Sequence, residues 1–216
     1  MPPSCCFDGW ARAGLRRARR GKLDGITSAL LDAVASVGLS GRSLLDVGCG
    51  AGALVVGSIE RGANRATGTD LGAGAIEAAR TLASERGVRG RTTFVSADGS
   101  VAELGTHDVV TLNRVICCYP DPVALVEHTL GAAAQVYAFT LPRSTGPVGR
   151  LNRAFVRMGN VFFRLRRGTF GDYRAFVHDG DAIHRRVVSA GFERVSVRRV
   201  YLVWHLALYV RAPRAS

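Results

Sequence analysis

The sequence predicts an α/β protein built on a mostly parallel sheet. Short apolar runs alternate with segments of helical periodicity, a glycine-rich turn ends the first run, and two strand-like segments close the chain. Such alternation is typical of parallel sheets, because a parallel strand pair needs a crossover that is usually a helix. The 216 residues, of which 47% are hydrophobic, suffice for one domain with a full core.

The elements are expected in the following order. A basic arm containing Gly and Pro occupies residues 1–22, and partial disorder is expected for it. One domain then spans residues 23–212. Its helices are expected over residues 23–37, from the glycine turn to about residue 61, over 73–86, after Pro122 and over 181–190. Its strands are expected over residues 43–47, 66–70, 92–95, 108–112, 135–141, 193–199 and 201–210.

Residues 147–167 interrupt this alternation with a basic amphipathic helix. Apolar residues recur there every three or four positions, and arginines fall mostly between them. One interpretation is an ordinary helix that packs on the domain and exposes its arginines to solvent. The other is a lid over an apolar substrate, or a helix that lies on a membrane surface.

Charge and cysteine content limit the function classes. The net charge of +12 favours an anionic partner, such as a carboxylate or phosphate substrate, an acidic membrane surface or nucleic acid. The five cysteines, an odd number with adjacent pairs, form a poor disulfide framework. Neither a signal peptide nor an apolar run of membrane-spanning length is apparent, so a cytoplasmic protein with reduced thiols is expected.

The stretch LLDVGCGAGAL, residues 44–54, carries the strongest functional signal. A buried strand ends at Gly48, and Gly50 and Gly52 follow before a helix. Glycine lets the backbone turn sharply and lets a ligand lie against bare main chain, which the N–H groups of the helix N-terminus also face. Asp46 would repel a pyrophosphate but suits a cationic ligand end. The pattern therefore indicates S-adenosylmethionine, whose amino group and sulfonium are both positive.

Other interpretations of the loop stay open on these residues alone. Gly48, Gly50 and Ala53 also satisfy the loose G-x-G-x-x-G/A pattern of dinucleotide folds, and a tight turn without a ligand is the simplest alternative. Two later acids favour the adenosyl ligand. Asp70 ends the second strand, where a carboxylate can accept both ribose hydroxyls, and Asp98 follows the third, where adenine N6 could donate to it.

Together with the strand order and the closing antiparallel pair, these residues make the chain resemble the class I (Rossmann-like) S-adenosylmethionine-dependent methyltransferases. The resemblance spans roughly residues 23–212. It implies a seven-stranded, mostly parallel sheet with helices on both faces and a C-terminal antiparallel strand, and methyl transfer that leaves S-adenosylhomocysteine. The cofactor-binding residues that it implies are Asp46, Gly48, Cys49, Gly50, Gly52, Asp70, Leu71, Asp98, Gly99 and Asn113.

Candidates on the acceptor side come from the carboxyl end of the fourth strand, where open α/β sheets bind ligands. Arg114 could clamp a substrate carboxylate, although an ion pair with a neighbouring acid is the simpler interpretation. Asn113 could orient an acceptor or act as a cap, and Tyr119 could line the pocket or the core. By analogy with the family, His178 is the best-placed base, or else a neighbour of a helix cap at Asp179. The catalytic candidates are therefore Asn113, Arg114, Tyr119 and His178.

The two cysteine pairs allow a further hypothesis. If the arm folded over the active-site mouth, Cys5, Cys6, Cys117 and Cys118 could bind zinc or a thiophilic substrate. Adjacent cysteines are unusual in structural zinc sites, and buried apolar cysteine is the simpler interpretation. No metal site is therefore assigned, and Cys49 is expected to be a small filler in the glycine loop.

The lead interpretation is a methyltransferase that O-methylates a small apolar or aromatic molecule, which can also be anionic. The stretches YPDP (119–122), FTLPRSTGP (139–147) and residues 178–192 resemble the magnesium-protoporphyrin O-methyltransferase branch and related bacterial small-molecule enzymes. A tetrapyrrole carboxyl methyltransferase is thus one alternative. A second alternative is an RNA methyltransferase, which the positive charge suggests, although the sequence shows no appended RNA-binding module. A third is a non-catalytic protein that binds the cofactor as a scaffold.

Overall fold

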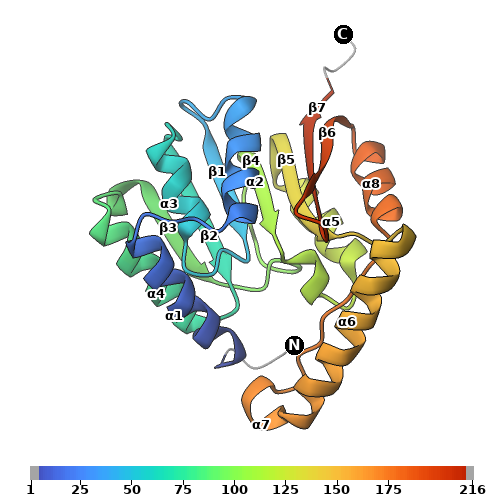
Figure 1. Ribbon diagram of the computed structural model, residues 1–216. Helices are drawn as coiled ribbons and strands as arrows, with labels where there is room; N and C mark the ends of the chain where they lie inside the picture. Colours follow the sequence, from blue (N-terminus) through green and yellow to red (C-terminus); the bar gives the residue numbers. More distant parts are fainter. Residues whose placement is uncertain (1–4, 213–216) are drawn as a thin grey trace.

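The computed structural model describes residues 5–212, and a seven-stranded sheet forms its centre (Figure 1). The strands are β1 (Ser43–Val47), β2 (Arg65–Asp70), β3 (Thr92–Ser96), β4 (His107–Asn113), β5 (Ala133–Pro142), β6 (Phe192–Val200) and β7 (Trp204–Arg211). They lie in the order β3-β2-β1-β4-β5-β7-β6. β7 is antiparallel to both neighbours, whereas the pairs among β1 to β5 are parallel. The predicted fold class is confirmed.

Helices cover both faces of the sheet. They are α1 (Cys5–Arg19), α2 (Gly25–Ser36), α3 (Ala53–Glu60), α4 (Ala73–Glu85), α5 (Pro122–Gly131), α6 (Gly146–Leu165), α7 (Arg167–Phe170) and α8 (Gly180–Ser189), with short 3-10 turns η1 (Arg89–Arg91) and η2 (Ile116–Cys118). One hydrophobic cluster joins the sheet to α2, α3 and α4, and a second joins its other face to α5 and α8. The crossovers after the parallel strands therefore enclose the sheet from both sides.

The side chains of β5 show how the sheet divides the core. Val136 and Ala138 belong to the cluster with α2, α3 and α4, while Tyr137 and Phe139 belong to the cluster with α5 and α8. Each of the four is 0–1% exposed. Successive side chains of a strand point to opposite faces, so a strand buried on both faces is apolar at every position. This is why the short apolar runs in the sequence located the strands.

Two helix starts and one strand boundary follow from local chemistry. The Asp24 carboxylate accepts from Ile26 N and caps α2, and the Asp179 carboxylate accepts from Asp181 N and caps α8. The last strand begins at Trp204, three residues later than the sequence predicts. Tyr201 has a φ of 54° and belongs to the turn between β6 and β7, which delays the pairing.

α1 occupies most of the segment for which the sequence predicts partial disorder. Small side chains face the domain along one side of the helix, and Ala11 and Ala18 are each only 5% exposed. Ala11 packs with Ala75 and Ala78 of α4. The alanines look like ordinary helix formers in the sequence, so nothing local marks them as a contact surface. A packed helix therefore replaces most of the expected arm.

α6 is the helix predicted for residues 147–167, and it lies differently from the others. It runs away from the sheet toward α7, on the opposite side of the molecule from α4 (Figure 1). Only Gly149 and Asn152 of its 20 residues are buried. None of the helices in the described part of the chain is long and apolar enough to cross a membrane.

We predict that Ala11→Glu detaches α1. A carboxylate placed among small apolar side chains would lose its hydration without gaining a partner. Amide hydrogen exchange over residues 5–19 should become about tenfold faster or more, while the sheet keeps its protection. The control is Ala13→Glu, because Ala13 is exposed on the same helix. Equal exchange in the two variants would show that this contact does not hold α1.

Candidate functional site

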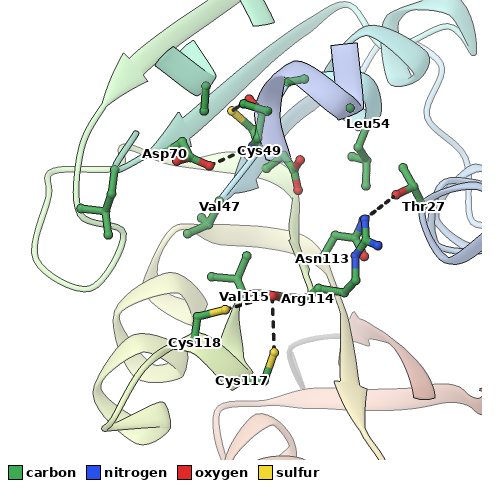
Figure 2. Close-up of a pocket in the computed structure, with 18 of the residues that line it drawn as sticks. Thr27, Val47, Cys49, Leu54, Asp70, Asn113, Arg114, Val115, Cys117 and Cys118 are labelled. Carbon is green, nitrogen blue, oxygen red and sulfur yellow. Dashed lines mark hydrogen bonds between the residues drawn. The ribbon is translucent and has the colours of Figure 1, made fainter. Parts of the chain in front are cut away.

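A cavity of about 850 Å³ opens at the carboxyl ends of the parallel strands (Figure 2). The ends of four strands line it through Val47 of β1, Asp70 of β2, Asn113 of β4 and Pro142 of β5. The strand order reverses between β1 and β4, and open α/β sheets bind ligands at such a point. α1, α6 and residues 172–176 supply further walls. The cavity therefore joins strand ends that are far apart in the sequence.

Backbone hydrogen bonds hold the loop after β1 to the end of β2. Gly48 N and Cys49 N donate to Thr69 O at 2.7 and 2.9 Å. Gly50 N donates to Asp70 Oδ2 at 2.9 Å. The loop therefore crosses the end of the neighbouring strand, and its main chain forms part of the cavity wall.

The three glycines of this loop have different roles. All three have positive φ, at 72°, 53° and 75° for Gly48, Gly50 and Gly52. A Cβ on Gly48 would lie 2.3 Å from Val115 Cγ2, and one on Gly52 would lie 2.8 Å from Ala79 Cβ. A Cβ on Gly50 would have no atom within 4 Å. Gly48 and Gly52 are thus required by packing, whereas Gly50 keeps the cavity side of the loop open.

Asp46 places a buried carboxyl group at the cavity wall. The residue is 2% exposed, and its Oδ1 accepts from Thr111 Oγ1 at 2.7 Å. Burial raises the pKa of the Asp46 carboxyl to about 7, opposed by the Thr111 hydrogen bond and assisted by the negative charge of Asp70. A cation placed beside Asp46 would favour the carboxylate. This region of the cavity therefore suits a positively charged ligand group.

The Asp70 carboxylate accepts hydrogen bonds from the glycine loop and from the residue that precedes α4. Its Oδ2 accepts from Gly50 N, and its Oδ1 accepts from Gly72 N at 2.8 Å. Leu71 follows it on the cavity wall. The role toward ribose hydroxyls that the sequence predicts for Asp70 is thus accompanied by a structural role.

Asp98 lies beside the cavity, and its sequence neighbours Ala97 and Gly99 form part of the cavity wall. Its Oδ1 accepts from Ser100 N and Ser100 Oγ, and from Tyr119 Oη at 2.9 Å. Burial and this bond to Asp98 raise the pKa of the Tyr119 phenol. The structure thus joins two predicted site residues to each other, and Tyr119 holds the chain after β4 against the loop after β3.

Asn113 belongs to a hydrogen-bond network that sequence reasoning missed. Its Nδ2 donates to Thr27 Oγ1 at 2.8 Å, and its Oδ1 accepts from Thr140 Oγ1 at 3.0 Å (Figure 2 shows the first bond). Thr27 lies in the first turn of α2, and Thr140 lies near the end of β5. The amide therefore links three elements at the cavity wall, and its local sequence contains no sign of these partners.

Arg114 makes the ion pair that the simpler interpretation expects. Its Nη2 lies 3.0 Å from Asp24 Oδ2, and this arginine side chain is 41% exposed. Its backbone has a φ of 61°, and its N–H donates to Thr140 Oγ1 at 2.8 Å. Because Arg114 also lines the cavity, its guanidinium remains within reach of a ligand there.

His178 is not brought to the cavity. Its Nε2 donates to Tyr119 O at 3.0 Å, and its ring stacks on Phe176 at a centroid distance of 5.4 Å. Burial lowers the pKa of this imidazole. No histidine is among the residues that line the cavity in the described part of the chain. The structure therefore shows His178 linking Tyr119 to the segment before α8, and its role as a base stays a prediction.

The cysteines near the cavity are free thiols. Cys49 and Cys117 are buried and Cys118 is half-buried. Both thiols of the Cys117-Cys118 pair lie 3.5 Å from Arg114 O (Figure 2). No group of three or more His, Cys, Asp or Glu that could hold a metal ion occurs among the described residues. The side chains of Cys5 and Cys6, which the zinc hypothesis requires, lie outside the described residues.

Three cations on the cavity wall were not recognised in the sequence. Arg17 and Lys22 come from the segment expected to be a basic arm, and Arg174 follows α7. Arg174 is exposed. They add cationic groups to a wall that also carries the carboxylates of Asp24 and Asp172. Only the tertiary structure reveals this, because all three are distant in sequence from the strand ends at the cavity.

The chain is similar to known methyltransferases. A methyltransferase-domain family model matches residues 44–136. The ubiquinone biosynthesis O-methyltransferase of Psychrobacter arcticus is 31% identical over 183 residues, which cover 80% of this chain and 67% of that protein. The protein of the same name from Pseudomonas aeruginosa is 33% identical over 148 residues, covering 67% of this chain and 62% of that protein. The matches thus span 62–67% of the length of these relatives.

A solved structure shows the same fold. Magnesium protoporphyrin IX methyltransferase from Synechocystis PCC 6803, crystallised with bound SAH, aligns with a TM-score of 0.68 at 22% identity. The alignment covers 93% of this chain and 95% of that one. The two chains therefore share their fold over nearly their whole length.

We predict that Gly48→Ala destabilises the loop and that Gly87→Ala does so much less. Both glycines have positive φ, at 72° and 67°, but only at Gly48 would the added Cβ meet an atom within 4 Å, namely Val115 Cγ2. The clash with Val115 should lower the free energy of unfolding by a further amount of about 1–3 kcal/mol. Urea denaturation measures both variants. Equal losses would mean that the backbone conformation alone, and not the contact with Val115, requires glycine.

Proposed function

Since the chain belongs to the class I S-adenosylmethionine-dependent methyltransferase family, we propose that it transfers a methyl group from S-adenosylmethionine to an oxygen of a small acceptor that is apolar or aromatic and carries an anionic group. One observation carries this proposal. A single cavity of about 850 Å³ joins the acids and glycines at the ends of β1 and β2 to apolar and cationic walls. Its volume is near the upper end of the range for drug-sized ligands, about 300–1,000 Å³, which leaves space for an acceptor beside the cofactor.

The residues at the ends of β1 and β2 fit S-adenosylmethionine. The buried Asp46 carboxyl suits the positive amino group, and Asp70 stands where ribose hydroxyls can donate. The open side of Gly50 lets the ligand lie against the main chain. Leu71, Ala97 and Gly99 supply wall surface for the adenine. When bound, this cofactor supplies a methyl group on a positively charged sulfur, which is already a strong electrophile.

The chain's own task is then to position the acceptor and exclude water. A carboxylate acceptor needs no general base, whereas a phenol benefits from one. The cations on the cavity wall favour an acceptor oxygen that is already ionised. Arg17, Lys22 and Arg174 would bind such an anion, and apolar residues such as Val156 and Phe176 would contact its body.

The named relatives support transfer to oxygen, since both are ubiquinone biosynthesis O-methyltransferases by name. A tetrapyrrole carboxyl group is the second candidate acceptor. It is favoured by the near-complete alignment with the magnesium protoporphyrin IX methyltransferase fold. Both candidates share an oxygen nucleophile on a large apolar body.

Methyl transfer is tested with S-adenosylmethionine labelled in the methyl group and a panel of aromatic carboxylates, phenols, porphyrins and RNA. We expect label in the small molecules and none in RNA. Arg174→Gln should raise the KM for an anionic acceptor by about tenfold with little change in kcat, because the lost ion pair acts on binding. Arg89→Gln, at an exposed site away from the cavity, is the control. Transfer to RNA alone, or cofactor binding without transfer to any acceptor, would overturn the proposal.

Cofactor affinity should depend on pH through Asp46. Its carboxyl has a pKa of about 7 in the free protein, and a bound cation favours its ionised form. Binding below this pH must therefore release a proton, and affinity should fall by up to about tenfold per pH unit as the pH decreases below about 7. Calorimetry in two buffers of different ionisation enthalpy measures the proton. Asp46→Asn should bind more weakly and show no such release; release that persisted in this variant would assign the proton to another group.

A further inference from the structure

We propose that the exposed side of α6 docks on a membrane surface rich in anionic lipids. Its apolar side chains are spaced by three and four residues and share one side of the helix, which we call the docking face. They are Leu151, Phe155, Met158, Phe162 and Leu165, which are 44%, 54%, 64%, 48% and 77% exposed. Large apolar side chains rarely gather on a protein surface without a partner.

Hydrogen bonds on the inward side of α6 determine which of its side chains are exposed. Asn152 Nδ2 donates to Arg143 O at 2.9 Å and to Val203 O at 3.0 Å. Two turns further along, Asn160 Nδ2 donates to Ala175 O, and Asn160 Oδ1 accepts from Ala175 N, both at 2.9 Å. These two anchors set the rotation of the helix about its axis, so the docking face is directed away from the domain.

The end of α6 is anchored in the same orientation. The Phe163 ring contacts Tyr173 at a centroid distance of 5.0 Å and Phe170 at 5.1 Å. Phe163 therefore faces the domain, while its neighbour Phe162 remains on the docking face. Phe163 is thus half-buried, whereas the adjacent Phe162, whose ring centroid lies 5.8 Å from that of Phe170, remains 48% exposed.

Four arginines lie along one flank of α6. Arg150, Arg153, Arg157 and Arg164 are exposed, and none is within ion-pair distance of a carboxylate in the described part of the chain. α6 contains no Asp or Glu. Guanidinium groups bind phosphate in a planar, bidentate manner. An apolar face with arginines along its flank is the composition of a helix that lies in the interface plane of an anionic bilayer.

A second copy of the chain fits this face less well. The spacing of the five apolar residues would allow two helices to pair, but it extends over only two heptads. Pairing would also bring unpaired arginines of two copies together without any acid on α6 to compensate. An anionic lipid surface satisfies both the apolar and the charged residues, and the choice of occupant rests on this complementarity.

Docking would also bring the cavity close to the bilayer. Val156 lies on the inward side of α6 and lines the cavity. An acceptor with an apolar body could then enter from the lipid phase. This consequence rests on the proposed function, whereas docking itself can be measured without cofactor or acceptor.

The test is co-sedimentation of the purified chain with vesicles of phosphatidylcholine alone or with about 30% phosphatidylglycerol, at low and high salt. We expect binding to the anionic vesicles that weakens with salt. The variant R150Q/R153Q/R157Q should partition about 100-fold more weakly, at roughly fivefold per arginine. The matched control R65Q/R89Q/R91Q removes the same charge from exposed sites elsewhere and should retain most of the binding.

The apolar contribution is tested separately. F155S/F162S should also lose binding to the anionic vesicles, whereas V101S, which changes an apolar residue that is 76% exposed on another surface, should not. All substituted residues are exposed, so each variant should keep a cooperative thermal transition, which confirms folding. Absence of binding to anionic vesicles, or equal losses in the two arginine variants, would overturn the proposal. A lipid-free dimer that F155S/F162S dissociates, without vesicle binding by the native chain, would assign the face to a second copy.

Discussion

The hydrogen bonds between the loop after β1 and the end of β2 are the constraint on which the site depends. Thr69 O receives two successive N–H groups of the loop, and the Asp70 side chain receives the next. Parallel pairing places Val47 beside Thr69, so the loop can cross the strand end only by a sharp turn. Gly48 allows that turn with a positive φ and also leaves space for Val115. The acids and the open main chain of the cavity are positioned by this local geometry.

The distribution of charge in the cavity follows from two separate parts of the fold. The acids come from the ends of β1 and β2, where the sheet holds them in place. The cations Arg17, Lys22 and Arg174 come from segments that pack over the sheet edge. Asp24 and Asp172 line the same cavity, so it offers carboxylates to a cationic ligand group and arginine and lysine side chains to an anionic one.

α6 shows how few contacts suffice to orient a helix. Asn152 and Asn160 hold it by side-chain bonds to the backbone, and Phe163 completes the contact through aromatic packing. Most of its apolar side chains make no contribution to either hydrophobic cluster of the core. One side of α6 thus attaches the helix to the domain, while most of its apolar side chains lie on the exposed side.

The sequence by itself determined the strands, the glycine loop and the acids at the strand ends. These are encoded locally, by apolar runs of strand length, by positive φ at glycine and by the order of turns along the chain. Only the tertiary structure decided the partners. It linked Asn113 to Thr27 and Thr140, joined Tyr119 to Asp98 and placed His178 behind two residues of the cavity wall. It also packed α1, within the expected arm, against the domain. Such contacts join residues far apart in the chain, and the short polar or small side chains that make them carry no periodic signal before the elements are packed.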